Sequence, residues 1–265
     1  MRFEGLVKAF LLAAAFEAMA LPGIFPASLC ADPAMDVARG DDLYHQGQLA
    51  DARKAYEAAL VAEPAHLVAL CRLARVESEL GEDAKGEEQR QLVAAAVEHA
   101  RAAVRSAPDS AQGHVWLAVA LGRQATREGP KTRLALSREI KSEIDRAIGI
   151  DPGIGRAYHA RALWNRKLAT LNAIERAVAN TVLGGVPKGA SMENAVRDLQ
   201  KAVELEPDYV NHRLELGRTY RMLKNHADAR RELEKAVELP PTSSARDTRY
   251  QAEAKELLGK LPRQG

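Results

Sequence analysis

One phrase occurs twice in the sequence, and the distance between its copies sets the period of the chain. The copies are AVRDLQKAVELEP at residues 195–207 and ADARRELEKAVELPP at residues 227–241. Each copy closes with a proline, and these prolines lie about 34 residues apart, a period typical of helix pairs that stack as repeats. Because each repeat buries its core against its neighbours, function is expected on the stacked surface.

The residues between the two prolines match one particular repeat, the tetratricopeptide (TPR) helix-turn-helix unit. Its small, aromatic and alanine positions are filled by Gly217, Tyr220, Ala229, Leu233 and Ala236. A glycine or alanine in the middle of a helix lets the paired helix approach closely, whereas a larger side chain would overpack the contact. We therefore predict an all-α fold, a right-handed α-solenoid of about five TPR-like helix pairs with a C-terminal capping helix.

The closing prolines divide the chain into units that together form one TPR-like domain, residues 32–265. The units are expected near 33–66, 67–110, 111–154, 155–209 and 210–243, with the capping helix at 244–261. The second and third units are longer than the period, and their excess falls in the charged stretches GEDAKGEEQR and QATREGPKTR. We expect these stretches to lengthen the turns between paired helices.

The fourth unit carries a longer insertion with a periodic apolar pattern. Leucine, isoleucine and valine recur at steps of three or four residues from 168 to 183. This spacing places them on one side of a helix and predicts an amphipathic helix that ends near Gly184. Two uses remain open: the helix packs along the solenoid, or it overhangs the binding surface as a lid or part of an apolar pocket.

The first 31 residues break the repeat and resemble a secretory signal peptide. Arg2 and Lys8 accompany a mostly apolar stretch, Leu11–Leu21, and the run ends at SLCADPA, where a cut near Cys30 or Ala31 is expected. The prediction is a periplasmic or secreted protein without a transmembrane segment in the mature chain. The alternative is a membrane anchor formed by an uncleaved leader. Glu17 and Pro22 disfavour the anchor, because they shorten the apolar run below the ~20 residues that span a bilayer.

Charge and cysteine content exclude several classes of function. The net charge is +2, and the leader holds two basic and two acidic residues, so its removal leaves the charge unchanged. This near-neutral balance argues against general nucleic-acid binding. After cleavage only Cys71 remains, so neither a disulfide framework nor a cysteine-rich metal motif is possible.

The motifs of common enzymes are missing from the sequence. The seven histidines form no HExxH and no close pair with carboxylates at metal-ligand spacing. The glycine-rich loop at 184–189 lacks the order of a phosphate-binding loop, and no GxSxG occurs. We therefore expect no enzymatic activity, no metal and no cofactor.

The first helix of each unit is expected to line a concave groove. Projecting those helices onto the concave side gives a mainly basic set of residues. The set comprises Arg72, Arg75, Trp116, Arg123, Arg156, His159, Arg166, Lys167, Arg218 and Arg221. Trp116 is more easily explained as a filler between helices than as a platform for a ligand.

A basic groove can hold an anionic partner, because arginine forks suit carboxylate and phosphate groups. The leading hypothesis is an interaction or scaffold protein that binds an acidic peptide segment of a protein partner. The alternative is a carrier of an anionic amphiphile or lipid, with the headgroup in the groove and the 168–183 helix over the tail. A third reading is a solvated face whose arginines pair with neighbouring glutamates.

Several stretches go beyond the repeat consensus. They are His114-x-Trp116, EGPK at 128–131, IKSEIDRAIGIDP at 140–152, ALW at 162–164 and LGRTYRMLKN at 216–225. With these features the chain resembles the regulator of microtubule dynamics family and its bacterial TPR relatives over roughly residues 67–261. The resemblance implies an all-α TPR-like domain with a binding or scaffolding role and no established catalytic residues. Some eukaryotic members associate with microtubules or membranes, but an exported chain would meet no tubulin, so that partner is not transferred.

Overall fold

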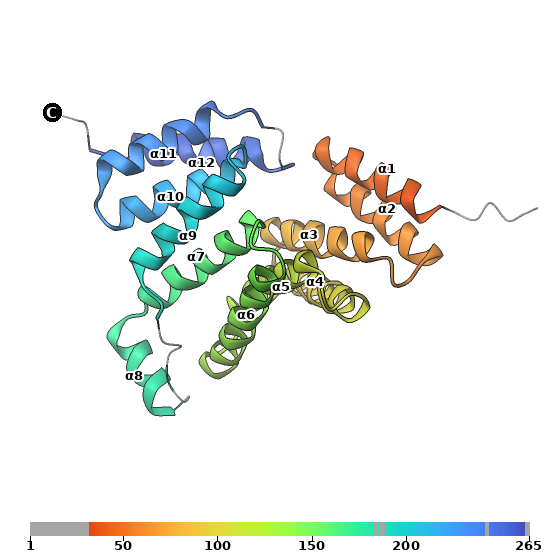
Figure 1. The fold of residues 1–265 in the computed structure, drawn as a ribbon, viewed down its shortest axis with the longest axis horizontal. Coiled ribbons are helices and arrows are strands. Elements are labelled where there is room, and N and C mark those ends of the chain that lie inside the picture. Colours follow the sequence, from red (N-terminus) through yellow and green to blue (C-terminus); the bar gives the residue numbers. More distant parts are fainter. Residues whose placement is uncertain (1–31, 183–184, 186–188, 242–243, 263–265) are drawn as a thin grey trace, which may run out of the picture. The chain divides into compact units, whose positions relative to one another are not determined.

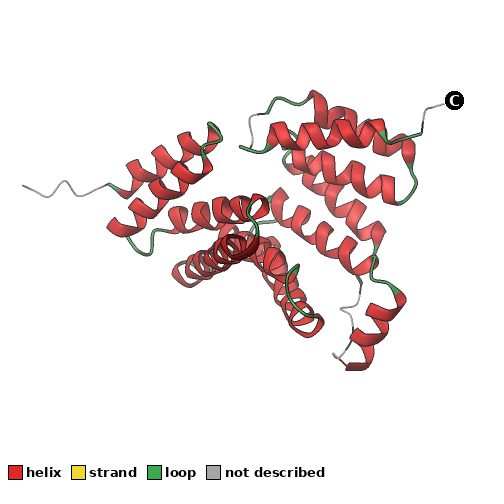
Figure 2. Ribbon diagram, turned by 180° about the vertical axis from the view of Figure 1, so that it is seen from behind, coloured by secondary structure: helices red, strands yellow, loops and turns green. Residues whose placement is uncertain are grey.

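The computed structural model describes residues 32–182, 185, 189–241 and 244–262, and within these residues it contains helices and no strands (Figure 2). The signal peptide predicted at 1–31 lies outside the described residues, so export stays a prediction. The described helices are α1 (Pro33–His45), α2 (Leu49–Ala62), α3 (Leu67–Asp83), α4 (Gly86–Ser106), α5 (Ala111–Ala125), α6 (Pro130–Ile150), α7 (Gly155–Ala169), α8 (Ala173–Val182), α9 (Met192–Leu205), α10 (Val210–Met222), α11 (His226–Glu238) and α12 (Asp247–Gly259).

These helices pair in chain order, with one insertion (Figure 1). The pairs are α1 with α2, α3 with α4, α5 with α6, α7 with α9, and α10 with α11, while α12 packs on α10 and α11. Neighbouring first helices also touch, because α3 packs against α5 and α5 against α7. The predicted α-solenoid of five TPR-like helix pairs with a capping helix is therefore confirmed.

Two glycines show why small residues recur at the helix-pair contacts. A Cβ added to Gly217 would lie 2.6 Å from Cγ of Leu233, and one added to Gly40 would lie 2.3 Å from the ring of Tyr56. Leu233 and Tyr56 are completely buried, so neither can move aside into solvent. The close approach predicted for Gly217 is therefore present, and Gly40 makes the same kind of contact in the first pair.

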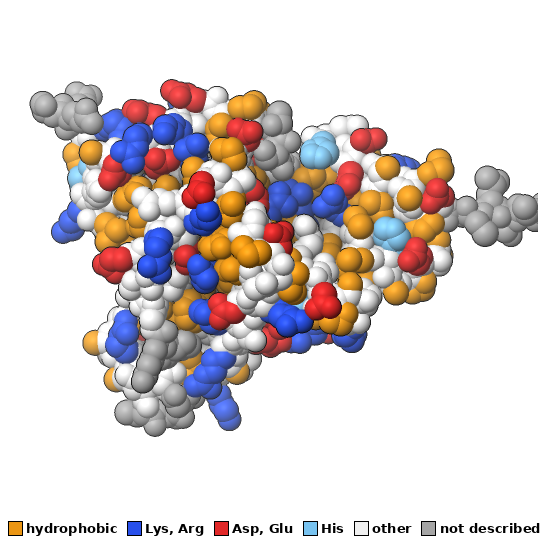
Figure 3. Space-filling model, viewed as in Figure 1, with side chains coloured by type: hydrophobic (Ala, Val, Ile, Leu, Met, Phe, Trp, Pro, Cys, Tyr) orange, Lys and Arg blue, Asp and Glu red, His pale blue; other side chains and the backbone are white. Residues whose placement is uncertain are grey.

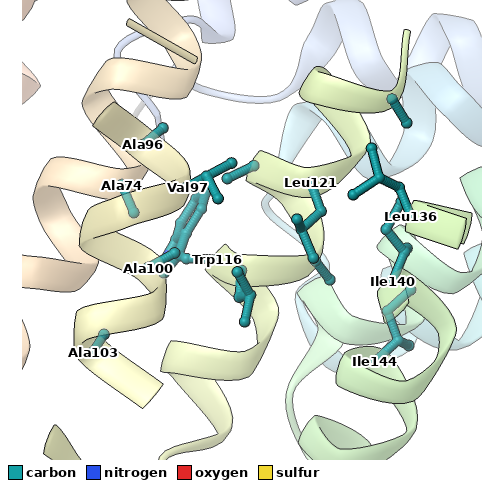
Figure 4. Packing of buried hydrophobic residues seen from close by; sticks show 14 of the residues in the cluster. Ala74, Ala96, Val97, Ala100, Ala103, Trp116, Leu121, Leu136, Ile140 and Ile144 are labelled. Atoms are coloured by element: carbon teal, nitrogen blue, oxygen red, sulfur yellow. The ribbon is translucent and has the colours of Figure 1, made fainter. Parts of the chain in front are cut away.

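The largest core cluster joins α3, α4, α5, α6 and α7. Figure 4 shows the ring of Trp116 beside small residues of α4, with Leu121 on the opposite side of α5 pointing toward Ile140 and its neighbours on α6. Trp116 and Trp164 are both almost completely buried in this cluster. Trp116 therefore fills the space between helices, as the sequence suggests.

The prediction of lengthened turns in the second and third units is wrong. Only Ala84 and Lys85 separate α3 from α4, and only residues 126–129 separate α5 from α6. The extra residues instead extend the helices, to 17 residues in α3 and 21 in both α4 and α6. Glutamate, glutamine and arginine are good helix formers, so these charged stretches continue helices as readily as they form turns.

The prediction of a single amphipathic helix at 168–183 is also wrong, because the helix is interrupted within the insertion. The backbone N–H of Glu175 donates to Oδ1 of Asn172 at 2.8 Å, and the N–H of Asn172 donates to Oε2 of Glu175 at 2.9 Å. This reciprocal pair is a capping box, which starts a new helix. Leu168, on the near side of the break, belongs to the core, and Leu171 packs against it.

Helix α8 itself packs closely against none of the other described helices. Its described side chains, such as those of Glu175 and Arg176, are exposed. The Arg176 guanidinium donates to the carbonyl of Leu168 at 3.3 Å, which ties the start of α8 to the end of α7. None of the described helices combines the length and apolar content that crossing a membrane requires.

Candidate partner-binding site

The ten residues predicted to bind a partner all lie on first helices. Arg72 and Arg75 are on α3, Trp116 and Arg123 on α5, four are on α7, and Arg218 and Arg221 are on α10. Their side chains bridge successive helices, as the pairs described below show. We call this surface, formed by the facing side chains of α3, α5, α7 and α10, the inner face.

Arg75, Trp116 and Arg156 form the first cluster on the inner face. The guanidinium carbon of Arg75 lies 5.7 Å from the ring centre of Trp116, and that of Arg156 lies 5.9 Å from it. Arg75 also stacks on Tyr44 at 4.0 Å, and Arg156 lies 5.0 Å from the ring of Tyr209. Each cation therefore rests on aromatic faces, an attraction that strengthens as water is excluded.

Three nitrogen donors in this cluster are buried and have no hydrogen-bond partner among the residues that the structure describes. They are Nη2 of Arg75, Nε1 of Trp116 and Nε of Arg156. Arg75 and Trp116 are each only 6% exposed, so these side chains are more than nine-tenths buried. A buried donor without a partner costs about 1–3 kcal/mol. By contrast, Nε1 of Trp164 donates to the backbone carbonyl of Ser137 at 2.9 Å.

The second cluster contains Arg166 and Arg218, which share Glu215. Both guanidinium groups donate to its carboxylate, and Arg166 also donates to Oγ1 of Thr219 at 2.9 Å. Arg218 reaches Glu253 of α12 at 2.9 Å as well. The side chain of Arg166 is only 15% exposed, so most of it is withdrawn from solvent. Its charge is held in place by a buried carboxylate.

Carboxylates balance most of the positive charge on the inner face. Five of the predicted arginines donate to carboxylates: Arg72 to Asp41, Arg75 to Glu79, Arg123 to Glu82, and Arg166 and Arg218 to Glu215. Lys167 is exposed, and Arg221 is half-buried with an Nε that has no hydrogen-bond partner. Figure 3 shows the same mixture over one face of the molecule, where basic and acidic side chains alternate.

His159 meets a second histidine that the sequence analysis did not assign to the site. Its Nδ1 lies 2.9 Å from Nδ1 of His212, and Nε2 of His212 lies 3.5 Å from Oε2 of Glu206. Because one of the two Nδ1 atoms must accept, this contact requires at least one neutral ring. Burial is the main cause that lowers the pKa of both histidines. The neighbouring His212 lowers the pKa of His159 further, while Glu206 opposes the shift at His212.

This pair predicts loss of stability in mild acid. A histidine with a lowered folded-state pKa contributes its full stability above the unfolded pKa of about 6.5, and loses it as the pH falls below that value. We expect the melting temperature to fall between pH 7.5 and pH 5.5. The fall should be smaller in the double variant His159→Gln, His212→Gln. The exposed His226→Gln serves as control, and an equal fall in all three proteins would contradict this assignment.

A clasp joins the C-terminal helix to the first helices and was missed by sequence reasoning. Oγ of Ser244 lies 3.1 Å from Oη of Tyr44, and Arg246 bonds Asp83 at 2.8 Å and lies 3.3 Å from Glu82. Arg246 also donates to the backbone carbonyl of Glu79. We call these contacts of Ser244 and Arg246 the clasp. No local pattern reveals it, because its partners lie more than 160 residues apart in the sequence.

Two of the surface cavities formed by the described residues lie near helix turns. One of about 210 Å³ is lined by Arg156, Glu206, Pro207, Asp208 and Tyr209, at the edge of the inner face. A larger one of about 340 Å³ lies on α1 and α2, away from the inner face, and its lining includes both acidic and basic residues. The smaller cavity is the one that adjoins the unpartnered donors.

Little in the described part of the chain suggests reaction chemistry. No group of three or more His, Cys, Asp or Glu residues there could hold a metal ion. Cys71 is buried, and burial raises the pKa of its thiol to about 12, so the reactive thiolate is scarce at neutral pH. The arrangement is instead suited to holding a charged ligand.

Comparison with known proteins identifies relatives. The family profile described as regulator of microtubule dynamics protein 1-3 matches residues 36–262. Regulator of microtubule dynamics protein 3 of Mus musculus is 30% identical over 221 residues, covering 82% of this chain and 47% of the mouse protein. Regulator of microtubule dynamics protein 1 of Bos taurus is 30% identical over 223 residues, covering 83% of this chain and 69% of the bovine protein.

A solved structure supports the fold independently. A thermophilic TPR protein of Thermus thermophilus superposes with a TM-score of 0.63 at 22% identity, covering 83% of this chain and 98% of the other. At this identity the likeness extends to the fold alone. The chain spans about half the length of the mouse relative. From its sequence match across nearly the whole described region, the chain belongs to the regulator of microtubule dynamics protein 1-3 family.

Proposed function

We propose that the chain is a non-catalytic interaction module that binds an acidic peptide segment of a protein partner in a groove along its inner face. The TPR-like fold and the family's name as regulators favour binding over catalysis. The observation that carries the proposal is the meeting of Arg75, Trp116 and Arg156, from the first helices of three successive units, with donors left unused. A ligand side chain that enters between these helices would reach all three.

The paired arginines fit the same proposal. Arg218 divides its guanidinium between Glu215 and Glu253, so a ligand carboxylate can replace the partly exposed Glu253 without leaving either arginine or Glu215 unpaired. Lys167 is exposed at the end of α7 and can contact an anion directly. A mixture of paired and exposed cations supports binding of moderate strength that depends on salt, because exposed charges are screened over ~8–10 Å.

The test is a pair of matched charge reversals, assayed by calorimetry with a capped glutamate-rich peptide and its glutamine counterpart. The inner-face variant is Lys167→Glu with Arg218→Glu, which spares the mostly buried Arg166. The control is Lys201→Glu with Lys235→Glu, which makes the same charge change on the second helices α9 and α11.

Each exposed contact is worth about 0.2–1 kcal/mol, and reversal replaces attraction by repulsion. We therefore expect the inner-face variant to weaken binding by about tenfold or more, since tenfold corresponds to about 1.4 kcal/mol. The control should change it by less than about threefold. Added salt should weaken binding to the unmodified chain. Equal losses in the two variants would show that only net charge matters.

A second candidate is the carrier of an anionic amphiphile or lipid. The observation that favours it is α8, an apolar-patterned segment that packs closely against none of the other described helices. Such a helix could cover an acyl tail while the inner face holds the headgroup. Mass spectrometry of lipids that stay with the purified chain tests this alternative. The carrier function requires that deletion of residues 173–182 releases these lipids.

A further inference from the structure

The three unused donors of the inner face converge on one place. Arg75, Trp116 and Arg156 belong to α3, α5 and α7, and the two guanidinium groups flank the same indole ring at 5.7 and 5.9 Å. Their N–H groups are buried and bonded to nothing among the described residues. Native proteins rarely leave even one such group unsatisfied, and a cluster of them indicates an absent acceptor.

Each arginine lies beside a carboxylate, but neither carboxylate satisfies the unused donors. Arg75 uses its Nε on Glu79, and that carboxylate also accepts from Tyr44 and lies 3.8 Å from Arg246. Glu79 is therefore already surrounded by donors and does not reach Nη2 of Arg75. Glu206 approaches Nε of Arg156 only to 3.5 Å, because one of its oxygens accepts from the backbone N–H of Arg156.

Tyr209 marks the entrance. Its ring lies over the Arg156 guanidinium at 5.0 Å and meets the ring of His212 edge-on at 4.6 Å. It also lines the cavity of about 210 Å³ that opens beside Arg156. Tyr209 is the residue before α10. Rotation of this side chain would uncover the guanidinium of Arg156, over which the ring lies.

We propose that Arg75, Trp116 and Arg156 form a seat for one glutamate carboxylate of the bound peptide, with Tyr209 as its movable cover. This assignment rests on the proposed peptide-binding function and names its anchoring contact. A carboxylate has two oxygens and about four acceptor positions, enough for all three N–H donors at once. The seat lies behind Tyr209 and not at the surface, so the carboxylate must be carried on a side chain long enough to enter.

The two tryptophans supply a direct readout. Each gives one indole N–H signal in a ¹⁵N correlation spectrum, and Trp164 already donates to Ser137, whereas Trp116 donates to nothing. Titration with a capped tri-glutamate peptide should move the Trp116 signal and leave the Trp164 signal in place. A tri-glutamine peptide should move neither. Trp116→Phe assigns the signal, because it removes that N–H alone.

Variants at Arg156 separate the seat from general attraction. Arg156→Gln should weaken tri-glutamate binding by more than about tenfold, as expected when a hydrogen bond to a charged group is lost. Arg156→Lys should weaken it several-fold, because a lysine keeps the charge but cannot place the same N–H. Lys235→Gln, on the outer helix α11, should leave it nearly unchanged.

The outcomes distinguish the seat from the function on which it rests. If the longer glutamate-rich peptide binds, but the Trp116 signal stays fixed and Arg156→Gln matches Lys235→Gln, the seat is wrong and the peptide-binding function stands. If neither acidic peptide binds, both fail. If inorganic phosphate moves the Trp116 signal while tri-glutamate does not, the seat takes phosphate groups and the carboxylate assignment is overturned.

Discussion

Gly217→Leu should destabilise the chain by about 1–3 kcal/mol, the usual range for overpacking a close helix contact. A Cβ at this position would lie 2.6 Å from Cγ of Leu233 and 3.2 Å from the carbonyl oxygen of Ala229. Leu233 is completely buried, and the backbone of α11 cannot yield without separating the α10 and α11 pair. Urea unfolding followed by circular dichroism measures the change.

A matched pair of alanine variants isolates the contact from helix propensity. Gly217→Ala should destabilise the chain because even its Cβ meets Leu233. Gly122→Ala, in the last turn of α5, meets nothing within 4 Å and should stabilise the chain by up to about 0.5–1 kcal/mol. If both alanines stabilise, the close approach of α10 and α11 is not real.

Arg246→Met should cost about 2–4 kcal/mol, slightly below the usual range for removing one member of a buried ion pair. Arg246 is 4% exposed and faces the acidic end of α3, where it meets Glu82, Asp83 and the backbone of Glu79. The loss is moderated because Glu79 keeps Arg75 and Tyr44 as partners. Thermal and urea unfolding both report it.

Arg249→Met is the control for the clasp. Arg249 also pairs with Asp83, but both side chains are about half exposed, at 46% and 57%. An exposed pair of this kind contributes about 0–1 kcal/mol. The two variants remove the same charge from the same segment, so equal effects would mean that the clasp does not hold the C-terminal helix to α3.

The repeat could be predicted from sequence because the contacts within a helix pair join residues at fixed positions of the same unit. Gly217 and Leu233 occupy fixed positions of one unit, so their contact follows from the period. The stretch at 81–90 could not be assigned in this way, since its charged residues suit either a turn or a helix. The break before α8 depends on the capping box of Asn172 and Glu175, which the apolar spacing from 168 to 183 conceals.

The sequence predicted which helices carry the site residues, but not which residues form ion pairs with each other. Projection placed Arg166 on a first helix correctly, but whether it faces solvent depends on Glu215 in the next unit. The clasp was invisible because Arg246 and Asp83 lie 163 residues apart. Unpartnered donors cannot be identified from sequence. Trp116 and Trp164 are both buried tryptophans, and only the structure shows that the indole nitrogen of Trp164 has an acceptor while that of Trp116 has none among the described residues.

Photo-cross-linking tests the proposed binding surface most directly. A glutamate-rich peptide carrying a photoreactive group at one end is bound to the full chain, irradiated, and the linked residues are located by mass spectrometry. We expect cross-links on α3, α5, α7 and α10, concentrated around Trp116 and Tyr209, and their loss when excess unlabelled peptide is added. Cross-links that compete in the same way but fall on α8 or on the second helices α2, α4, α6, α9 and α11 would contradict binding at the inner face.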